Sequence, residues 1–261
     1  MTTYTSNINI SSEQYQKTFP YPHMFQDNFL DENFAKDLQA EILSIPHEEW
    51  DRYENPFEKK FTLRDKFNFP KHLSAIFGEL TSKRFVEQLS HIVGYDLLLD
   101  ETRTFWGVHR YVSGDKLDIH VDAGIHPAMS LKKQITLGIY LSNNWREEYG
   151  CELEIWTGEN SSDNDALLFE KTVAISPMFN RLILFTCDDY SWHGNPEPAD
   201  CPMDSTRIFL TLSYLSNKAD DKNKRKKAFF IARPNDPPNP TKDELRLLRA
   251  DPEKCKYVYR I

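Results

Sequence analysis

Between residues 98 and 216, short apolar stretches alternate with polar turns, which is the pattern of a β-rich core. Ile208, Leu210 and Leu212 would share one face of a strand, because successive side chains of a strand point to opposite faces. Strands are predicted over residues 104–112, 117–121, 135–142, 152–156, 167–175, 181–186 and 207–215. Short strands without intervening helices predict a sandwich or a jelly roll.

Upstream of this core the sequence has the texture of helices. An apolar residue at every fourth position behind the N-cap Asp31 predicts a helix that ends near Ser44. Another helix is expected from the N-cap Ser82 to a stop at Gly94. Residues 45–70 are charged and turn-rich, and no strand is predicted there.

These patterns divide the chain into three predicted regions. Residues 1–97 are expected to form a helical N-terminal buttress packed on the core, and residues 98–216 form the jelly-roll core itself. Residues 217–261 are a polar, Pro-rich C-terminal extension with one short helix over residues 242–250. The basic run 222–227 is interpreted as a solvated linker.

Composition and charge exclude several classes of protein. With 261 residues, 39% hydrophobic and 13% aromatic, the chain can bury a sizeable core. A net charge of −8 argues against nucleic acid as a partner, and no apolar run approaches the roughly 18 residues of a membrane span. The polar N-terminus lacks the features of a signal peptide, and the 4 scattered cysteines are expected to be free thiols. We therefore expect a cytoplasmic protein; the oligomeric state stays open.

The candidate chemistry lies at His120 and Asp122, at the end of the predicted strand 117–121. Residues two apart in a strand point to the same face, so the imidazole and the carboxylate could converge on one point. A distant histidine, His193, would complete a set of two histidines and one carboxylate, which suits non-haem Fe(II) and leaves three metal positions open. The pair alone is weak evidence, because His-x-Asp is expected roughly once by chance in a chain with 8 histidines.

Two other histidines compete for this role. His47 and Glu49 form a second His-x-carboxylate pair, but no third ligand is evident for them. His126 follows Asp122 by four residues, and we expect it to belong to a mobile loop, residues 123–133, that covers a substrate.

The order of the motifs resembles that of the Fe(II)/2-oxoglutarate-dependent dioxygenases, in particular the prolyl-4-hydroxylase-like family. The segment from Tyr111 to Asp122, with Gly114, Leu117 and His120 at its fixed positions, is similar to the metal-binding strand of the family. The remaining motifs follow in the family's order: residues 139–145, residues 150–156, residues 177–185, His193 and Arg207. One departure is Cys151, which stands where the family has the second glycine of a Gly-Gly motif. The resemblance covers about residues 98–216.

The resemblance implies a double-stranded β-helix core, cupin-like in architecture, with a mononuclear metal centre. His120, Asp122 and His193 would be the catalytic residues that bind Fe(II). Arg207 would hold the far carboxylate of 2-oxoglutarate, since a guanidinium binds a carboxylate through two hydrogen bonds.

Four further residues are expected around the cosubstrate. The resemblance implies that the hydroxyls of Tyr140 and Tyr111 hydrogen-bond to 2-oxoglutarate, and Thr211, on the predicted strand of Arg207, is expected to line the same pocket. His109 shares the strand face of Tyr111, so we expect it to border this pocket too.

The implied reaction is hydroxylation of an unactivated C–H bond, coupled to decarboxylation of 2-oxoglutarate to succinate and CO2. O2 is the second cosubstrate, and ascorbate is a further candidate cofactor. Asp122 disfavours the related halogenases, in which a small residue at this position makes room for chloride.

The substrate could be a prolyl or other peptidyl residue, or a small metabolite. Demethylation and desaturation share the same first chemistry and stay open. A catalytically silent jelly roll that binds a metal or a ligand, as a sensor or scaffold, is the alternative from another class of protein.

Overall fold

The computed structural model describes residues 3–63, 68–162, 165–217, 225–251, 253–254 and 258. The strands of these residues are β1 (His23–Asp27), β2 (Trp50–Glu54), β3 (Glu58–Leu63), β4 (Leu98–Leu99), β5 (Gly107–Tyr111), β6 (Lys116–Val121), β7 (Lys132–Tyr140), β8 (Leu153–Gly158), β9 (Leu168–Ile175), β10 (Arg181–Thr186), β11 (Trp192–Asn195), β12 (Arg207–Ser216) and β13 (Phe229–Phe230). The helices are α1 (Ser12–Gln16), α2 (Glu32–Leu43), α3 (Lys71–Leu80), α4 (Lys83–Val93) and α5 (Pro240–Ala250), with 3-10 turns η1 (His47–Glu49) and η2 (Glu147–Tyr149).

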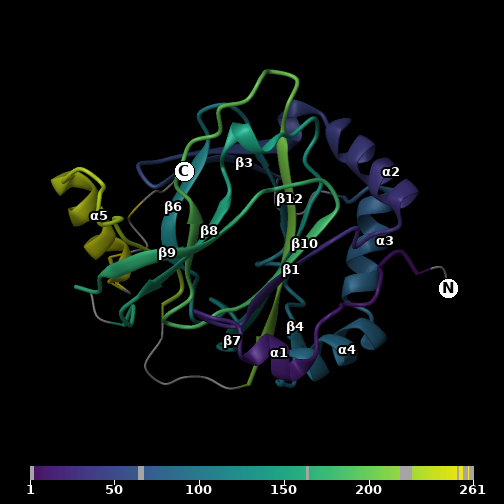
Figure 1. The fold of residues 1–261 in the computed structure, drawn as a ribbon, viewed down its shortest axis with the longest axis horizontal. Coiled ribbons are helices and arrows are strands. Elements are labelled where there is room, and N and C mark those ends of the chain that lie inside the picture. The colour runs from purple at the N-terminus through teal and green to yellow at the C-terminus, as the bar shows by residue number, and fades with distance from the viewer. Residues whose placement is uncertain are drawn as a thin grey trace.

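All the described strands join one antiparallel sheet that curls into a nearly closed barrel (Figure 1). Its order is β1-β10-β7-β12-β5-β3-β6-β11-β8-β9, while β2, β4 and β13 pair with β3, β12 and β6. Helices α2, α3 and α4 lie together on one side of the sheet, and α5 lies on the opposite side. The predicted jelly-roll core is confirmed.

The helix ends follow the predicted capping residues. The Asp31 side chain accepts a hydrogen bond from the Phe34 backbone N–H at 2.9 Å, and Ser82 caps α4 in the same way. Gly94 ends α4 in the left-handed region, with φ of +74°, where glycine meets no steric penalty. The predicted helices α2 and α4 are therefore confirmed, α5 lies where the C-terminal helix was predicted, and α1 and α3 are additional helices.

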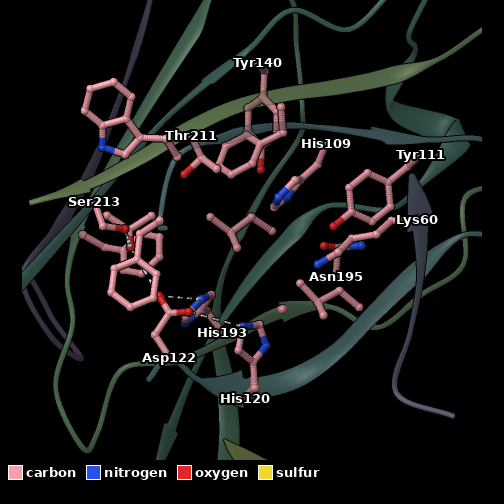
Figure 2. Close-up of a pocket in the computed structure, with 18 of the residues that line it drawn as sticks. Lys60, His109, Tyr111, His120, Asp122, Tyr140, His193, Asn195, Thr211 and Ser213 are labelled. Carbon is pink, nitrogen blue, oxygen red and sulfur yellow. Dashed lines mark hydrogen bonds and ion pairs between the residues drawn. The ribbon is translucent and has the colours of Figure 1, made fainter. Parts of the chain in front are cut away.

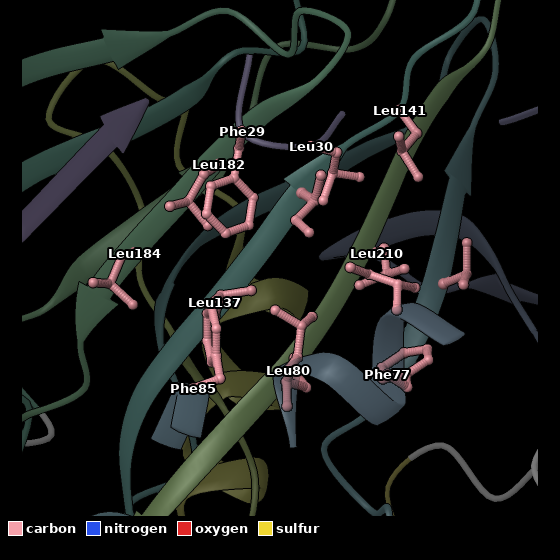
Figure 3. Close-up of a cluster of buried hydrophobic side chains, with 14 of the residues drawn as sticks. Phe29, Leu30, Phe77, Leu80, Phe85, Leu137, Leu141, Leu182, Leu184 and Leu210 are labelled. Atoms are coloured by element: carbon pink, nitrogen blue, oxygen red, sulfur yellow. The ribbon is translucent and has the colours of Figure 1, made fainter. Parts of the chain in front are cut away.

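A hydrophobic core lies between the helices and the sheet (Figure 3). Leu137 of β7, Leu184 of β10 and Leu210 of β12 are fully buried in the same cluster as Leu80 and Phe85 of the helices. Burying each such side chain contributes about 1.5–3 kcal/mol to folding. The opposite faces of these three strands point into the barrel.

The region predicted to be helical and turn-rich also supplies strands, which corrects the expectation for residues 45–70. Strand β1 pairs with β10, and β3 pairs with both β5 and β6 inside the sheet. The partners lie far away along the chain, so local periodicity did not reveal these strands. The three-part division of the chain stays a prediction, although β1–β3 and β13 extend the sheet beyond residues 98–216.

The C-terminal extension packs against the outside of β6. Strand β13 pairs with β6 at Val121 and His120, and the Lys242 ammonium of α5 forms an ion pair with the Asp118 carboxylate of β6. In the basic run 222–227, residues 222–224 lie outside the described part of the chain. Arg225 is not a solvated linker residue, because it is largely buried and pairs with Asp189 at 2.9 Å.

Two expectations about the whole chain can be compared with the described residues. The three described cysteines, Cys151, Cys187 and Cys201, are free and buried, whereas Cys255 lies outside the described residues. No helix of the described chain has the length and apolar character needed to cross a membrane.

Candidate metal centre and substrate pocket

Two neighbouring strands bring the predicted metal ligands together. His120 on β6 and His193 on β11 are directly paired across the ladder, and Asp122 follows the end of β6. One ligand atom from each residue lies within 4.8 Å of the others, and Figure 2 shows the three side chains grouped in the pocket. The Nε2 atoms of His120 and His193 lie 3.9 and 4.0 Å from the Asp122 carboxylate oxygens. Strand β11 was not predicted, yet it is the element that delivers His193.

Backbone carbonyls fix the orientation of both imidazole rings. Nδ1 of His120 lies 2.9 Å from the Asp118 carbonyl oxygen, and Nδ1 of His193 lies 2.8 Å from that of Ser191. A carbonyl can only accept, so each Nδ1 carries the proton and each Nε2 presents a lone pair toward Asp122. Burial lowers the pKa of His120 to about 3 and also lowers the pKa of His193. Both rings are therefore neutral, as metal ligation requires.

The carboxylate of the set is held in its ionised form. Burial opposes ionisation, but the charge of Lys133 and its hydrogen bond hold the pKa of Asp122 well below its ordinary value. The Lys133 Nζ lies 2.7 Å from Oδ2 of Asp122, and the Thr136 hydroxyl donates to the same oxygen at 3.3 Å. Two neutral imidazoles and one carboxylate on one wall are a donor set that fits Fe(II).

A buried guanidinium that has no anionic partner in the described part of the chain faces the same cavity. Arg207 is 2% exposed, and its Nη2 donates to the Tyr140 hydroxyl at 3.1 Å. Its central carbon lies 4.4 Å from the Tyr111 ring centroid. Within the described residues, Nε and Nη1 of Arg207 have no hydrogen-bond partner. Such a buried cation could bind an anion, and a carboxylate matches its geometry.

The metal ligands and Arg207 line one cavity of about 240 Å³. The expectation that His109 borders this cavity is confirmed, and Tyr111, Tyr140 and Thr211 line it as well. The Thr211 hydroxyl already donates to the Leu137 carbonyl at 3.0 Å. The structure thus brings all eight predicted site residues to one cavity, while their individual roles stay predictions.

Two glycines are required by close packing at this site. A Cβ on Gly138 of β7 would lie 2.0 Å from the ring of Phe209, which lines the cavity. A Cβ on Gly194 would lie 2.8 Å from the Asp118 carbonyl oxygen, so a side chain there would push β11 away from β6. Gly194 therefore lets His193 approach His120. Cys151 has φ of +54°, a conformation usual for the glycine that it replaces in the motif.

The competing histidines lie outside the ligand cluster. His126 is buried, with Nε2 3.2 Å from the Asp100 carboxylate, and its backbone N–H donates to the Leu131 carbonyl at 2.7 Å. The segment predicted as a mobile loop thus contains a hydrogen-bonded hairpin. His47 lies on η1, and its Nδ1 is 3.3 Å from the Arg110 guanidinium.

The structure adds pocket residues that the sequence did not reveal. Lys60 of β3 lines the cavity and pairs with Glu58 at 2.8 Å, and Asn195, the last residue of β11, lines it too. Lys133 lines it too, as do Phe105 and Trp106. Lys60 lies in the region where no strand was predicted, so the alternation of side chains along a strand could not indicate that it faces the cavity. For Lys133, an irregularity in β7 reverses the side-chain direction that simple alternation would give.

Comparisons with known proteins agree with this site. Residues 106–215 match the sequence profile of the 2OG-Fe(II) oxygenase superfamily. No curated protein sequence matches the chain.

Several solved structures have a similar fold. A prolyl-4-hydroxylase of Pseudomonas putida has a TM-score of 0.56 at 14% identity, covering 78% of this chain and 98% of that one. A prolyl hydroxylase of Trichoplax adhaerens, solved with a peptide of hypoxia inducible factor, has a TM-score of 0.55 at 19% identity, covering 80% and 89%. SnoK, an alpha ketoglutarate dependent carbocyclase from nogalamycin biosynthesis, has a TM-score of 0.55 at 13% identity, covering 87% and 89%. At these identities the likeness shows a shared fold.

Proposed function

We propose that this protein is a 2OG-Fe(II) oxygenase that hydroxylates an unactivated C–H bond of a small molecule or a peptidyl residue, a proposal supported by the match of residues 106–215 to the profile of that superfamily. His120, Asp122 and His193 would hold Fe(II), and Arg207 would hold the far carboxylate of 2-oxoglutarate. With O2, the bound iron and 2-oxoglutarate supply the oxidation of the C–H bond while 2-oxoglutarate is decarboxylated to succinate and CO2. The protein residues supply binding, orientation and exclusion of water.

One observation carries the proposal: the candidate metal-ligand cluster lines the same cavity as a buried guanidinium that has no anionic partner among the described residues. The cluster alone would also suit a structural metal site, and Arg207 alone would suit any small acid. Together they fit a dicarboxylate that reaches from a metal to a cation. This arrangement supports an oxygenase over a protein that binds only a metal or only an acid.

The residues around the two ends of the cavity differ in character. Figure 2 shows Tyr111, Lys60 and Asn195 on one side of the histidines, and Ser213 and Thr211 on the side of Asp122. The Tyr140 hydroxyl already accepts a hydrogen bond from Arg207, so it is placed to donate its own proton to a bound carboxylate. We assign the tyrosine side to the cosubstrate and the Asp122 side to the substrate.

The substrate, a further cofactor and the location are also part of the proposal. The structural neighbours include enzymes named for a prolyl residue and for a carbocyclic product, so the fold does not choose among substrates. Ascorbate stays a candidate cofactor. The cytoplasm remains the proposed location, because the described cysteines are free thiols rather than disulfides.

Oxygen-dependent formation of succinate tests the proposed function. The Fe(II)-loaded protein should convert 2-oxoglutarate to succinate in air, slowly without substrate, and not under argon. Asp122→Ala should abolish this conversion while the protein keeps its β-sheet circular dichroism, because Asp122 is a pocket residue and not a core one. Wild-type succinate formation by Asp122→Ala would refute the ligand assignment. If Fe(II) binds but no succinate forms, the sensor or scaffold alternative is favoured.

A further inference from the structure

Lys133 faces the pocket because strand β7 contains a bulge beside it. Tyr214 of β12 pairs with Ile135, whereas the next residue, Leu215, pairs with Lys133, so Gln134 is an extra residue in β7. An extra residue reverses the direction of the side chains that precede it. The bulge therefore turns Lys133 into the cavity, and Lys132 does not line it.

The Lys133 ammonium is buried next to the metal ligands. Its side chain is 9% exposed, and Nζ lies 2.7 Å from Oδ2 of Asp122 and 5.0 Å from the Phe105 ring centroid. Among the described residues, Asp122 is its single ion-pair partner. Lys60, the other lysine of the cavity, has a separate partner in Glu58.

If the proposed function is correct, the balance of charge in this cavity changes when the metal and the cosubstrate bind. In the metal-free protein, the negative charge of Asp122 balances the positive charge of Lys133. A bound divalent metal would be balanced in part by the same carboxylate. One carboxylate of 2-oxoglutarate would then bind the metal, and the other would pair with Arg207. One positive charge remains, on Lys133, in a site where an unpaired cation is costly. The whole chain carries −8, so this local excess is not a consequence of overall composition.

We propose that Lys133 binds the carboxylate of the substrate, and that the substrate is a small carboxylic acid. Phe105 and Trp106 line the same cavity and would contact the apolar part of the acid. Binding the carboxylate at Lys133 places the rest of the molecule beside Asp122, and so beside the metal. The cavity of about 240 Å³ lies below the roughly 300–1,000 Å³ of pockets for drug-sized ligands, which suits a small free acid.

A matched pair of probes tests this assignment without turnover. The protein is loaded with Mn(II), saturated with 2-oxoglutarate under argon, and titrated in a calorimeter with cyclopentanecarboxylate or with the neutral cyclopentanecarboxamide. The carboxylate should bind at least tenfold more tightly than the amide, as expected for a charge-assisted hydrogen bond. Lys133→Met should remove this preference, Lys133→Arg should retain it in part, and Lys132→Met should leave it unchanged.

Three results distinguish the possible failures. If 2-oxoglutarate itself does not bind to the Mn(II)-loaded protein, the proposed function fails and the inference fails with it. If 2-oxoglutarate binds but the carboxylate shows no preference over the amide, the inference alone is refuted. A preference that persists in Lys133→Met would mean that the anion binds elsewhere, such as directly on the metal, and would also refute it.

Discussion

The two faces of strand β12 serve different purposes. Ile208, Leu210, Leu212 and Tyr214 point toward the helices and are fully buried in the hydrophobic core. The alternate residues, including Arg207 and Thr211, line the cavity with the metal ligands. One ten-residue strand thus carries a face that stabilises the fold and a face that binds ligands, separated only by side-chain direction.

The two faces of the strand allow the ligand-binding residues of the barrel to differ while its core stays the same. The core face faces α2–α4 and tolerates little change, since interiors are close-packed. The cavity face contains polar and charged groups that would be unfavourable if no ligand occupied the site. Substitutions on the two faces of β12 should therefore have separable effects, one on stability and one on binding.

Removing the charge on the cavity face should have the largest effect. Arg207→Ala should weaken 2-oxoglutarate binding about 100-fold or more, because breaking a buried ion pair costs about 3–5 kcal/mol. Calorimetric titration of the Mn(II)-loaded variant under argon measures this change. An unchanged affinity would show that another cation, with Lys60 as the first candidate, holds the cosubstrate.

A substitution on the core face should give the opposite pattern. Leu210→Ala should lower the free energy of unfolding by about 2–5 kcal/mol, because it leaves a cavity in the core between β12 and the helices. Urea denaturation measures the loss, and 2-oxoglutarate binding below the unfolding transition should stay within about threefold of the wild type. A large loss of affinity in this variant would contradict the separation of the two faces.

The smallest expected effect concerns the pH dependence of stability. Burial, with the charge of Lys60, holds the pKa of His109 well below 6.5, so the folded protein does not take up the proton that the unfolded chain binds below about pH 6.5. His109 therefore costs about 1.4 kcal/mol of stability for each pH unit below that value. His109→Asn should lose less stability than the wild type between pH 7 and pH 5, measured by urea denaturation of the metal-free proteins. Equal losses would contradict the assignment.

The sequence predicted the elements whose signals are local. The caps Asp31 and Ser82 and the stop at Gly94 are written in a few adjacent residues, and the alternation along β12 needs no partner strand. The metal ligands were found because His120 and Asp122 sit two apart and the surrounding motifs follow a family order.

The elements that the sequence did not reveal depend on distant partners. Strand β11 has four residues and includes Gly194, so its sequence alone resembles a turn. Its pairing with β6 and β8 makes it a strand. Strand β3 joins the sheet through β5 and β6, and Lys60 comes with it. Lys133 was expected only as part of the loop 123–133, and its direction into the cavity depends on the bulge at Gln134, which exists only in the paired strand.

The central claim is that one cavity binds Fe(II) and 2-oxoglutarate together, and an anaerobic optical titration tests it most directly. Fe(II) and then 2-oxoglutarate are added to the wild type and to Asp122→Ala, and the visible charge-transfer band of a 2-oxo acid chelated to Fe(II) is recorded. We expect the band in the wild type and its absence in Asp122→Ala. Absence of the band in a wild-type protein that has bound Fe(II) would contradict the account.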